Sequence, residues 1–373
     1  MRILELLASP VWTGPAEPMA SVAAELVRRG HSVEMAVDTL RSGDLAGRLR
    51  EMGFAVHDEL GLSAKSYPWR IALDLHRLID LAPAFEIFHS HFSHDQLLAV
   101  VAGRRSATRP RVVRTVHSSR SLRGRFLRAT VHRRTDGLIA VCQSYADVLL
   151  RRFRLDPRRV ATIRGAVDAN SFTPDGPDLR SELGIPAAAP VAGIVSRIKP
   201  ERRHLDLVRA FAEVVGDLPD ARLAIIGRGE ALPAVKREVE RLGLAARILF
   251  AGYRSGDQLR AAYRTLDVKV LLAEGNDGSC RAMLEAMACG RPVIAYRFGA
   301  PAETIIADAN GLLVEPGDVA ALANALKQLL SDRERCARLG AQARVHVQRL
   351  FTESARADAV ESFLGEILRL PHT

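Results

Sequence analysis

The sequence predicts an α/β fold with two parallel-sheet domains, and three observations support this prediction. The chain has 373 residues, which is long for a single domain. Short apolar runs alternate with longer amphipathic stretches along its whole length, as in repeated strand–helix–strand units. A stretch rich in proline and glycine, residues 170–190, separates two complete series of this alternation and is the best candidate for a linker.

The expected strands are continuous apolar runs, which are typical of sheets covered by helices on both faces. We place the domain boundary near Pro174, with one domain over 1–173, a second over 174–350, and a final helix at 351–373 that packs back on the first. Two such domains facing one another would bind ligands at the carboxyl ends of their strands. The expected strands are 2–8, 33–37, 86–90, 111–116 and 137–142, then 191–196, 222–226, 247–250, 268–272 and 292–296.

Composition excludes several classes of protein. Hydrophobic residues make up 48% of the chain, which provides a sizeable core and argues against a disordered protein. No apolar run reaches the ~18 residues of a membrane-spanning helix. Glu5 interrupts the first apolar run, so we expect no signal peptide. The cysteines, Cys142, Cys280, Cys289 and Cys336, form no metal-binding pattern, so we expect reduced thiols in a cytoplasmic protein.

The formal charge of +10 is unevenly distributed. Between Arg104 and Arg164 there are 17 arginines and three acidic residues. Such a block attracts polyanions, namely nucleic acid, an anionic membrane or a phosphorylated substrate, unless it is only a solvated surface. The aromatic residues of this block are Phe126, Tyr145 and Phe153, too few for a platform on which bases stack. We therefore predict no nucleic-acid partner.

The most informative segment is residues 274–294, EGNDGSCRAMLEAMACGRPVI. The apolar strand before it ends in a polar, glycine-containing turn, and a helix follows from about Ser279 to Cys289, where Gly290 ends it. The turn directs free backbone N–H groups and the positive end of the helix dipole toward a ligand, which suits a phosphate group.

Two carboxylates, Asp277 and Glu285, lie on either side of this anion-binding turn. They suit a ligand with hydroxyls at both ends and phosphates in the middle, which describes a nucleotide sugar. The structural alternatives are that Asp277 only caps the helix and that Glu285 only pairs with Arg281 at i, i+4.

The same segment resembles the E-x7-E signature of family 4 glycosyltransferases, and the run LEAMACGRPVIA is close to the usual wording of that family. The resemblance implies the GT-B fold, in which two Rossmann-like domains with parallel sheets face a central cleft. It implies that Glu285 binds the ribose hydroxyls of the donor. The first acidic position falls on Asp277, where the family usually has Glu, and Glu274 is the alternative contact to the donor sugar. Four further residues of this segment are predicted to bind the donor, Gly278, Ser279, Cys280 and Arg281.

A second segment, RIKPERR at 197–203, resembles the G-R-L-x-x-x-K-G turn of the family. Arg197 matches the arginine, and Arg202 stands where lysine is usual. Two cations at a strand–helix turn can hold the donor diphosphate and offset the charge that builds on the leaving group, so both are predicted to be catalytic. Gly227 and Arg228 resemble the G-x-G turn of the family, and Tyr253 lies where the family contacts the base.

The N-terminal half resembles the family more loosely. Gly14 and Pro15 follow the first strand in place of a glycine-rich loop and are predicted to contact the acceptor or a phosphate, although Pro15 offers no N–H. The run HSHFSH at 89–94 resembles a strand that ends in H-a-H. His117 matches the histidine that borders the donor sugar at the reaction centre. The histidines of 89–94 have no evident carboxylate partner, so we predict no metal site.

The resemblance covers nearly the whole chain and implies retaining transfer of a hexosyl group from a UDP-, GDP- or ADP-sugar. In the implied front-face mechanism, the departing diphosphate accepts the proton of the acceptor. No carboxylate pair suggests a glycosidase-like covalent nucleophile. No D-x-D motif is present, so we expect neither a cofactor nor a required metal.

The acceptor is a hypothesis. The arginine block and an amphipathic stretch at 121–134, with Leu122, Phe126 and Val131, predict peripheral docking on the anionic inner face of the cytoplasmic membrane. A glycan or lipid-linked acceptor in cell-envelope or lipopolysaccharide synthesis would then be natural. The alternatives are another GT-B enzyme, such as a nucleotide-sugar epimerase or sugar-phosphate transferase, and a basic nucleic-acid-binding protein.

Overall fold

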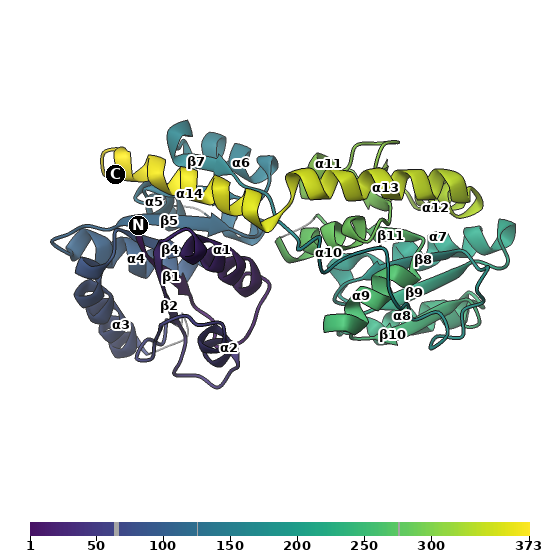
Figure 1. Cartoon of the computed structure of the whole chain (residues 1–373), viewed down its shortest axis with the longest axis horizontal. Coiled ribbons are helices and arrows are strands. Elements are labelled where there is room, and N and C mark those ends of the chain that lie inside the picture. The colour runs from purple at the N-terminus through teal and green to yellow at the C-terminus, as the bar shows by residue number, and fades with distance from the viewer. Residues whose placement is uncertain (63–66, 125, 275–276) are drawn as a thin grey trace. The chain divides into compact units, whose positions relative to one another are not determined.

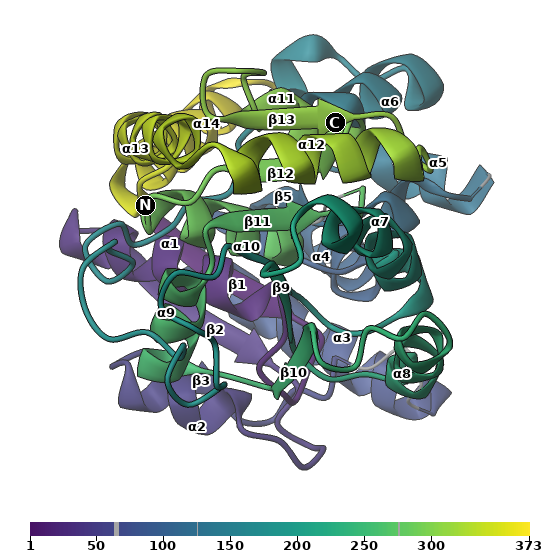
Figure 2. The ribbon, with the colours of Figure 1, turned by 90° about the vertical axis from the view of Figure 1, so that its right-hand side faces the viewer.

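The chain forms two compact α/β units in a computed structural model that describes residues 1–62, 67–124, 126–274 and 277–373 (Figures 1 and 2). Unit 1 comprises Met1–Gly165 and Glu353–Thr373, and unit 2 comprises Ala166–Thr352. In each unit a parallel sheet carries helices on its faces. This confirms the predicted fold class.

Unit 1 contains, within its described part, a seven-stranded parallel sheet ordered β3-β2-β1-β4-β5-β6-β7. The order reverses between β1 and β4, and open sheets of this kind bind ligands beside such a switch point, at the carboxyl ends of the strands. The strands are β1 (Arg2–Leu7), β2 (Ser32–Val37), β3 (Val56–His57), β4 (Ile87–Ser90), β5 (Arg111–Val116), β6 (Gly137–Ala140) and β7 (Val160–Thr162). The helices are α1 (Ala16–Arg28), α2 (Leu45–Glu51), α3 (Pro68–Leu81), α4 (Ser93–Arg105), α5 (Phe126–Arg133), α6 (Gln143–Phe153) and α14 (Glu353–Arg369), with 3-10 turns η1 (Ala82–Ala84), η2 (Ser119–Leu122) and η3 (Pro157–Arg159).

Unit 2 has a six-stranded parallel sheet in its described residues, ordered β10-β9-β8-β11-β12-β13, with the switch point between β8 and β11. Figure 2 shows α7 and α12 side by side on this sheet, and the two helices are in contact. The strands are β8 (Val191–Val195), β9 (Arg222–Ile226), β10 (Ile248–Gly252), β11 (Val268–Leu271), β12 (Val293–Tyr296) and β13 (Gly311–Val314). The helices are η4 (Pro200–Arg202), α7 (His204–Asp217), α8 (Leu232–Arg241), α9 (Gly256–Thr265), α10 (Asp277–Ala288), α11 (Gly299–Thr304), α12 (Val319–Ser331) and α13 (Arg333–Leu350).

Strand β1 shows why apolar runs become central strands in this fold. Successive side chains point to opposite faces of a strand. Ile3 and Leu7 pack into the core cluster that α1 and α14 cover, whereas Leu4 and Leu6 pack into the cluster on the other face. By the same alternation Glu5 points to the face of α1 and α14, where a carboxylate needs polar partners.

All ten expected strands correspond to strands of the described chain, with ends that differ by up to two residues. Short strands β3, β7 and β13 were not predicted. The chain passes from unit 1 to unit 2 at Gly165–Ala166, before the predicted Pro174. The reason is that Val167 and Ala169 pack in the core of unit 2, where Val167 N donates to Phe351 O at 2.9 Å.

The predicted amphipathic stretch at 121–134 contains the end of the 3-10 turn η2 and the helix α5, and two of the three apolar residues named for it are buried. Leu122 closes the 3-10 turn η2 and is buried, and Val131 on α5 is 9% exposed and packs in the core of unit 1. The side chain of Phe126 lies outside the described residues. Leu122 and Val131 therefore point into the protein, whereas Leu127 on α5 is 70% exposed. Across the described helices, none combines the length and apolarity needed to cross a membrane.

Candidate active site

The switch point of unit 2 brings two of the predicted segments to one edge of the sheet. Arg197 and η4 follow β8, and the start of α10 follows the neighbouring strand β11. Arg202 interacts electrostatically with Cys280 on the first turns of α10 and with Arg197 on its own turn. Two segments that were predicted separately from the sequence, one with Arg197 and Arg202 and the other with Cys280, thus lie near one another.

Arg202 is the most informative of these side chains. It is half-buried, and its Nε lacks a hydrogen-bond partner among the residues that the structure describes. Burial lowers the pKa of the Arg202 guanidinium, and Arg197 lowers it further, while Glu201 and Cys280 oppose the shift. A buried donor without a partner is costly, and an anionic ligand would relieve that cost through charge-assisted hydrogen bonds.

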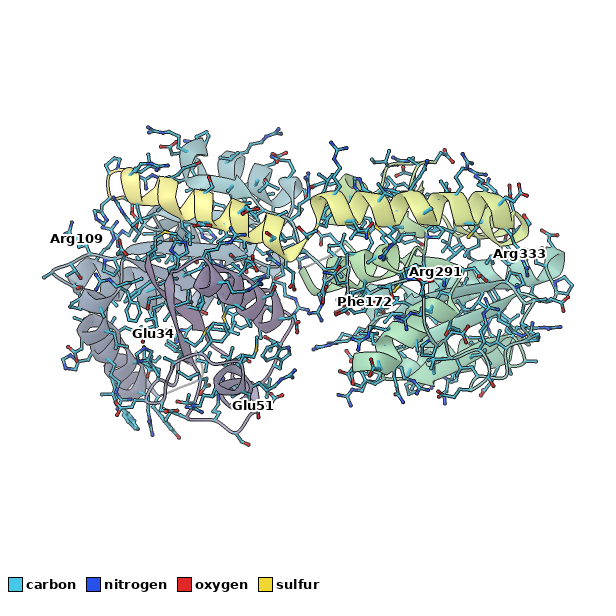
Figure 3. All side chains as sticks on the ribbon, in the orientation of Figure 1. Glu34, Glu51, Arg109, Phe172, Arg291 and Arg333 are labelled. Carbon is cyan, nitrogen blue, oxygen red and sulfur yellow. The ribbon has the colours of Figure 1, made fainter. Side chains whose placement is uncertain are left out.

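Glu285 lies on α10 with a buried carboxylate that two residues hold in place. Tyr263 Oη donates to Oε2 at 2.6 Å, and Arg281 Nε lies 3.2 Å from Oε1. The i, i+4 pair that was the structural alternative is therefore present, together with a second partner from α9. Burial raises the pKa of Tyr263 well above its usual value, and Glu285 raises it further, so Tyr263 is a stable donor. Phe172, labelled in Figure 3, packs edge-on against Tyr263 with ring centroids 5.9 Å apart.

Lys269 is a charged residue of this edge that the sequence analysis missed. It is fully buried on β11 and donates to Val270 O at 2.9 Å and to Val195 O at 3.4 Å. Burial lowers the pKa of Lys269 to about 7, Glu285 opposes this shift, and Arg202 adds to it. A lysine inside the apolar run VKVLL was the available signal. Lys269 thus lies close enough to interact with Glu285 and with Arg202, a residue of the turn at 197–203 that is called the cationic turn below.

Two glycines let the β9–α8 turn lie directly on the cationic turn. A Cβ at Gly227 would be 1.9 Å from Ser196 O, and one at Gly229 would be 2.2 Å from Ile198 O. Gly227 also has φ of 140°, which L residues rarely adopt. Its N–H donates to a backbone carbonyl, Gly252 O, at 2.8 Å. Close packing of the two turns therefore explains why residue 227 is a glycine. A direct contact of Gly227 with the donor stays a prediction.

Arg228 and Tyr253, both predicted to bind the donor, lie together at the same end of the sheet. The Arg228 guanidinium is 4.6 Å from the centroid of the Tyr253 ring, and both side chains are exposed. A cation and an aromatic ring paired at the surface can hold a planar base or a phosphate.

The first turn of α10 is described as backbone only. The side-chain roles predicted for Asp277, Gly278 and Ser279 therefore lie outside the described residues. Glu274 is exposed, and its carbonyl lies where a Cβ on Gly299 would approach to 2.1 Å. Gly299 has φ of 61°, so this second close approach of backbones, which the sequence analysis did not find, also requires glycine.

The switch point of unit 1 holds a buried cluster of histidines around Glu5. Glu5 on β1 is in register with His89 on β4. Glu5 Oε1 is 3.0 Å from His89 Nδ1, and Glu5 Oε2 is 2.7 Å from His91 Nε2. His91 Nδ1 is in turn 2.9 Å from His117 Nε2. The prediction that these histidines lack a carboxylate partner was wrong, because the partner comes from a neighbouring strand far away in the sequence.

The charges of this cluster are set by burial and by the histidines. Burial would raise the pKa of Glu5, but His89 and His91 outweigh it and lower that pKa to about 2. Burial, followed by the charge of His89, lowers the pKa of His91 to about 3. At neutral pH Glu5 is therefore a carboxylate and His91 is neutral.

Glu5, His89 and His91 bring three potential ligand atoms within 4.8 Å of one another, so they could hold a metal ion. Their short contacts also form a complete set of hydrogen bonds without one. His94 stands apart, since its Nε2 is buried without a partner among the described residues. That the protein needs no metal stays a prediction.

The remaining predicted residues are more scattered. Gly14 is exposed, and Pro15 precedes α1 at its N-cap, so both lie on the turn after β1 and their acceptor role stays a prediction. The arginine block is not a uniform surface, because Arg111 and Arg114 are buried. Arg109, by contrast, is exposed in the segment between α4 and β5 (Figure 3). The four cysteines are buried, and none of them forms a disulfide within the described residues.

Two open parallel sheets of this order, one with a cationic turn beside a helix start at its switch point, define an α/β protein of the Rossmann type. The family model for glycosyl transferases group 1 matches residues 175–346, and the model for glycosyltransferase family 4 matches residues 15–171. The chain belongs to the family 4 glycosyltransferases of the GT-B fold.

Relatives and solved structures agree with this assignment. The D-inositol 3-phosphate glycosyltransferase of Stackebrandtia nassauensis is 34% identical over 245 residues, which are 63% of this chain and 55% of the relative. This chain thus spans about half the length of that relative. The enzyme of the same name from Corynebacterium diphtheriae is 27% identical over 94% of this chain and 89% of the relative. Anabaena HepE in complex with UDP and glucose has a TM-score of 0.82 at 20% identity, covering 98% of this chain and 99% of that one, which shows the shared fold.

Proposed function

We propose that this chain transfers a glycosyl group from a nucleoside diphosphate sugar to a hydroxyl of an acceptor, with retention at the anomeric carbon. The observation that carries the proposal is Arg202, whose buried Nε lacks a partner in the described structure and which lies close to the start of α10. Guanidinium N–H groups and the N–H groups of a helix start both favour a diphosphate.

The charges of this edge suit the departure of a diphosphate. Breaking the bond between sugar and phosphate adds negative charge to the leaving group, and preorganised cations stabilise that charge in the transition state. Arg197 and Arg202 would contact the diphosphate. Glu285, held by Tyr263, would accept hydrogen bonds from the ribose hydroxyls. The diphosphate oxygen then takes the proton of the acceptor, so no protein nucleophile is required.

The acceptor we favour is a phosphorylated polyol. Relatives are named for D-inositol 3-phosphate, and an anionic acceptor suits the exposed arginines of the block from Arg104 to Arg164. Leu122 and Val131, two of the three apolar residues on which membrane docking was partly based, are buried and so do not support it. A lipid-linked acceptor of the cell envelope is the second acceptor class to assay.

A thermal-shift screen with UDP-, GDP- and ADP-sugars tests donor binding. At least one donor should raise the melting temperature of the wild type, and Arg202→Ala and Glu285→Ala should abolish that shift. Arg209→Ala is the matched control, because Arg209 is exposed on α7 and pairs with Glu238 at 2.8 Å. An unchanged melting temperature with every donor, in a protein that is fully folded, would overturn the proposal.

A further inference from the structure

A small pocket lies in unit 1 at the amino ends of strands β5 and β6. Its lining comes from the end of α4, the segment that leads into β5, the segment between α5 and β6, and the chain beyond α14. The polar residues of this lining are Arg104, Arg109, Arg134, Asp136, His372 and Thr373. Open parallel sheets bind their principal ligands at the carboxyl ends of the strands, so this pocket is separate from the switch point of unit 1.

The pocket carries an excess of positive charge. Asp136, the acidic residue of its lining, is already matched by cations that lie outside the pocket. Asp136 Oδ1 lies 3.4 Å from Arg111 Nη1 and 3.9 Å from Arg159 Nη1. Asp136 Oδ2 accepts a hydrogen bond from Val112 N at 2.9 Å. The carboxylate is therefore engaged elsewhere, and the arginines that line the pocket are not neutralised by it.

Arg109 and Arg134 are exposed, and their guanidinium groups make no hydrogen bond or ion pair within the part of the chain that the structure describes. Arg109 (Figure 3) also has a backbone φ of 46°, a left-handed conformation that costs about 1–3 kcal/mol in residues other than glycine. Pro110 follows it, and the residue before a proline normally adopts an extended conformation. Unfavourable backbone conformations of this kind are common in segments that bind ligands.

The helix dipole does not account for all of these cations. Arg104 and Arg134 lie near the carboxyl ends of α4 and α5, where positive charge is favourable. Arg104, however, donates to Thr373 O at 2.7 Å, outside its own helix, and Arg109 belongs to no helix. An anion in the pocket would offset the repulsion among these guanidinium groups.

His372 lies close enough to the arginines to sense their charge. Burial lowers the pKa of His372, and the charge of Arg111 lowers it further, while Asp136 opposes the shift. Arg109 and Arg104 make smaller contributions that also lower this pKa. The ring of His372 therefore reports on any charge that enters the pocket.

We propose that this pocket binds a phosphate group through Arg109 and Arg134, with Arg104 beside them. The planar guanidinium group matches the oxygens of phosphate with two parallel hydrogen bonds. The cavity volume of about 20 Å³ exceeds the ~10–15 Å³ that one water needs, so the pocket takes a single small group at its mouth and not a whole nucleotide. The phosphate group belongs to a small phosphorylated molecule or to a lipid headgroup. Because the pocket lies away from the switch point, binding there is independent of the proposed sugar transfer.

Histidine NMR at constant pH and ionic strength tests the pocket with inorganic phosphate. The ring signal of His372, assigned by its loss in His372→Gln, should shift and saturate as phosphate replaces chloride. The double variant Arg109→Gln/Arg134→Gln removes both charges and should weaken the apparent affinity by about tenfold or more. The control variant Arg237→Gln/Arg349→Gln removes two charges from exposed positions of unit 2 and should respond as the wild type does.

Sedimentation with vesicles of phosphatidylcholine and phosphatidic acid separates the two sources of phosphate. If the group belongs to a lipid, these vesicles should sediment the wild type and the control variant but not the double variant. If it belongs to a small molecule, the His372 signal should saturate with inorganic phosphate and the vesicles should sediment none of the three proteins. The absence of both saturation and sedimentation in the wild type, or equal responses of the double variant and the control variant, would overturn the proposal.

Discussion

Burial separates the charged residues that shape this site from those that only face solvent. Arg209 on α7 is exposed and pairs with Glu238, and such exposed pairs contribute little to stability. Lys269 is fully buried and close to Glu285 and Arg202, so its protonation state is coupled to folding. The pKa of a single buried residue of this kind can therefore be measured through the pH dependence of the unfolding free energy.

Lys269 should make stability depend on pH. Its pKa is 10.5 when unperturbed and about 7 in the folded protein, so between these values the unfolded state binds more protons. Stability therefore rises with pH from 7 to 10.5 and loses this contribution as the pH falls toward 7. The difference in unfolding free energy between wild type and Lys269→Met should change over this range by a few kcal/mol, since one pKa unit is about 1.4 kcal/mol. Denaturant unfolding at several pH values measures this difference. Unfolding free energies of the two proteins that change with pH in parallel would refute the prediction.

Sequence reasoning pointed to residues that belong to contiguous motifs and missed those whose partners are remote. Arg197, Arg202 and Glu285 were predicted because two contiguous segments resemble motifs of the family, and their roles stay predictions. The role of Glu5 was missed because its partners, His89 and His91, lie on β4, and nothing in a single sequence states that β1 and β4 are neighbours. Lys269 was missed for a similar reason, since burial is a property of the folded sheet.

At the scale of elements, the site depends on close packing of two turns. The β9–α8 turn lies on the turn after β8, with Ile198 N donating to Arg228 O at 3.0 Å. Backbone approach at this distance leaves no room for a Cβ at Gly227 or Gly229. The turn that carries Arg197 and Arg202 is therefore packed against the β9–α8 turn, and this packing requires glycine at positions 227 and 229.

Gly227→Ala should displace the turn that carries Arg197. Its Cβ would be 1.9 Å from Ser196 O, and its φ of 140° is strained for alanine. We expect a loss of about 1–3 kcal/mol in unfolding free energy and a weaker response to donor in thermal-shift assays. Gly216→Ala in α7 is the control, because a Cβ there meets nothing within 4 Å, and it should stabilise by about 0.4–1 kcal/mol. Equal effects of the two substitutions would contradict this packing.

Elements were predicted well where they are long and periodic. The central strands are apolar on both faces and were identified, whereas β3 is only two residues long and β7 three, too short for a pattern. Periodicity at 121–134 correctly indicated an apolar side, but it could not tell whether protein or membrane covers that side. Leu122 and Val131 show that protein covers it.

At the scale of the whole molecule, the chain has two units with separate cores, and its last helix belongs to the first unit. Helix α14 packs on α1, and Leu364 and Ile367 are fully buried in the core of unit 1. The hydrophobic core of unit 1 therefore includes residues from the C-terminal helix, which follows unit 2 in the sequence. The core of unit 2, including Leu329 on α12, is built from residues of that unit alone.

Substitutions in the two cores should act on different unfolding transitions. Leu364→Ala should destabilise unit 1, and Leu329→Ala unit 2, each by about 2–5 kcal/mol. Both tryptophans of the chain, Trp12 and Trp69, belong to unit 1, so their fluorescence reports on that unit while circular dichroism reports on both. Leu364→Ala should shift the fluorescence transition and Leu329→Ala should leave it in place. Identical shifts from both variants would show that the units do not unfold separately.

The most direct test of the account is to follow the anomeric proton of the product by NMR while the purified chain acts on its donor and a phosphorylated polyol. We predict a new glycoside with the anomeric configuration of the donor, formed by the wild type and reduced about a hundredfold or more in kcat/KM in Arg202→Ala. A product with inverted configuration, an epimerised donor without transfer, or full activity in Arg202→Ala would contradict the central claim.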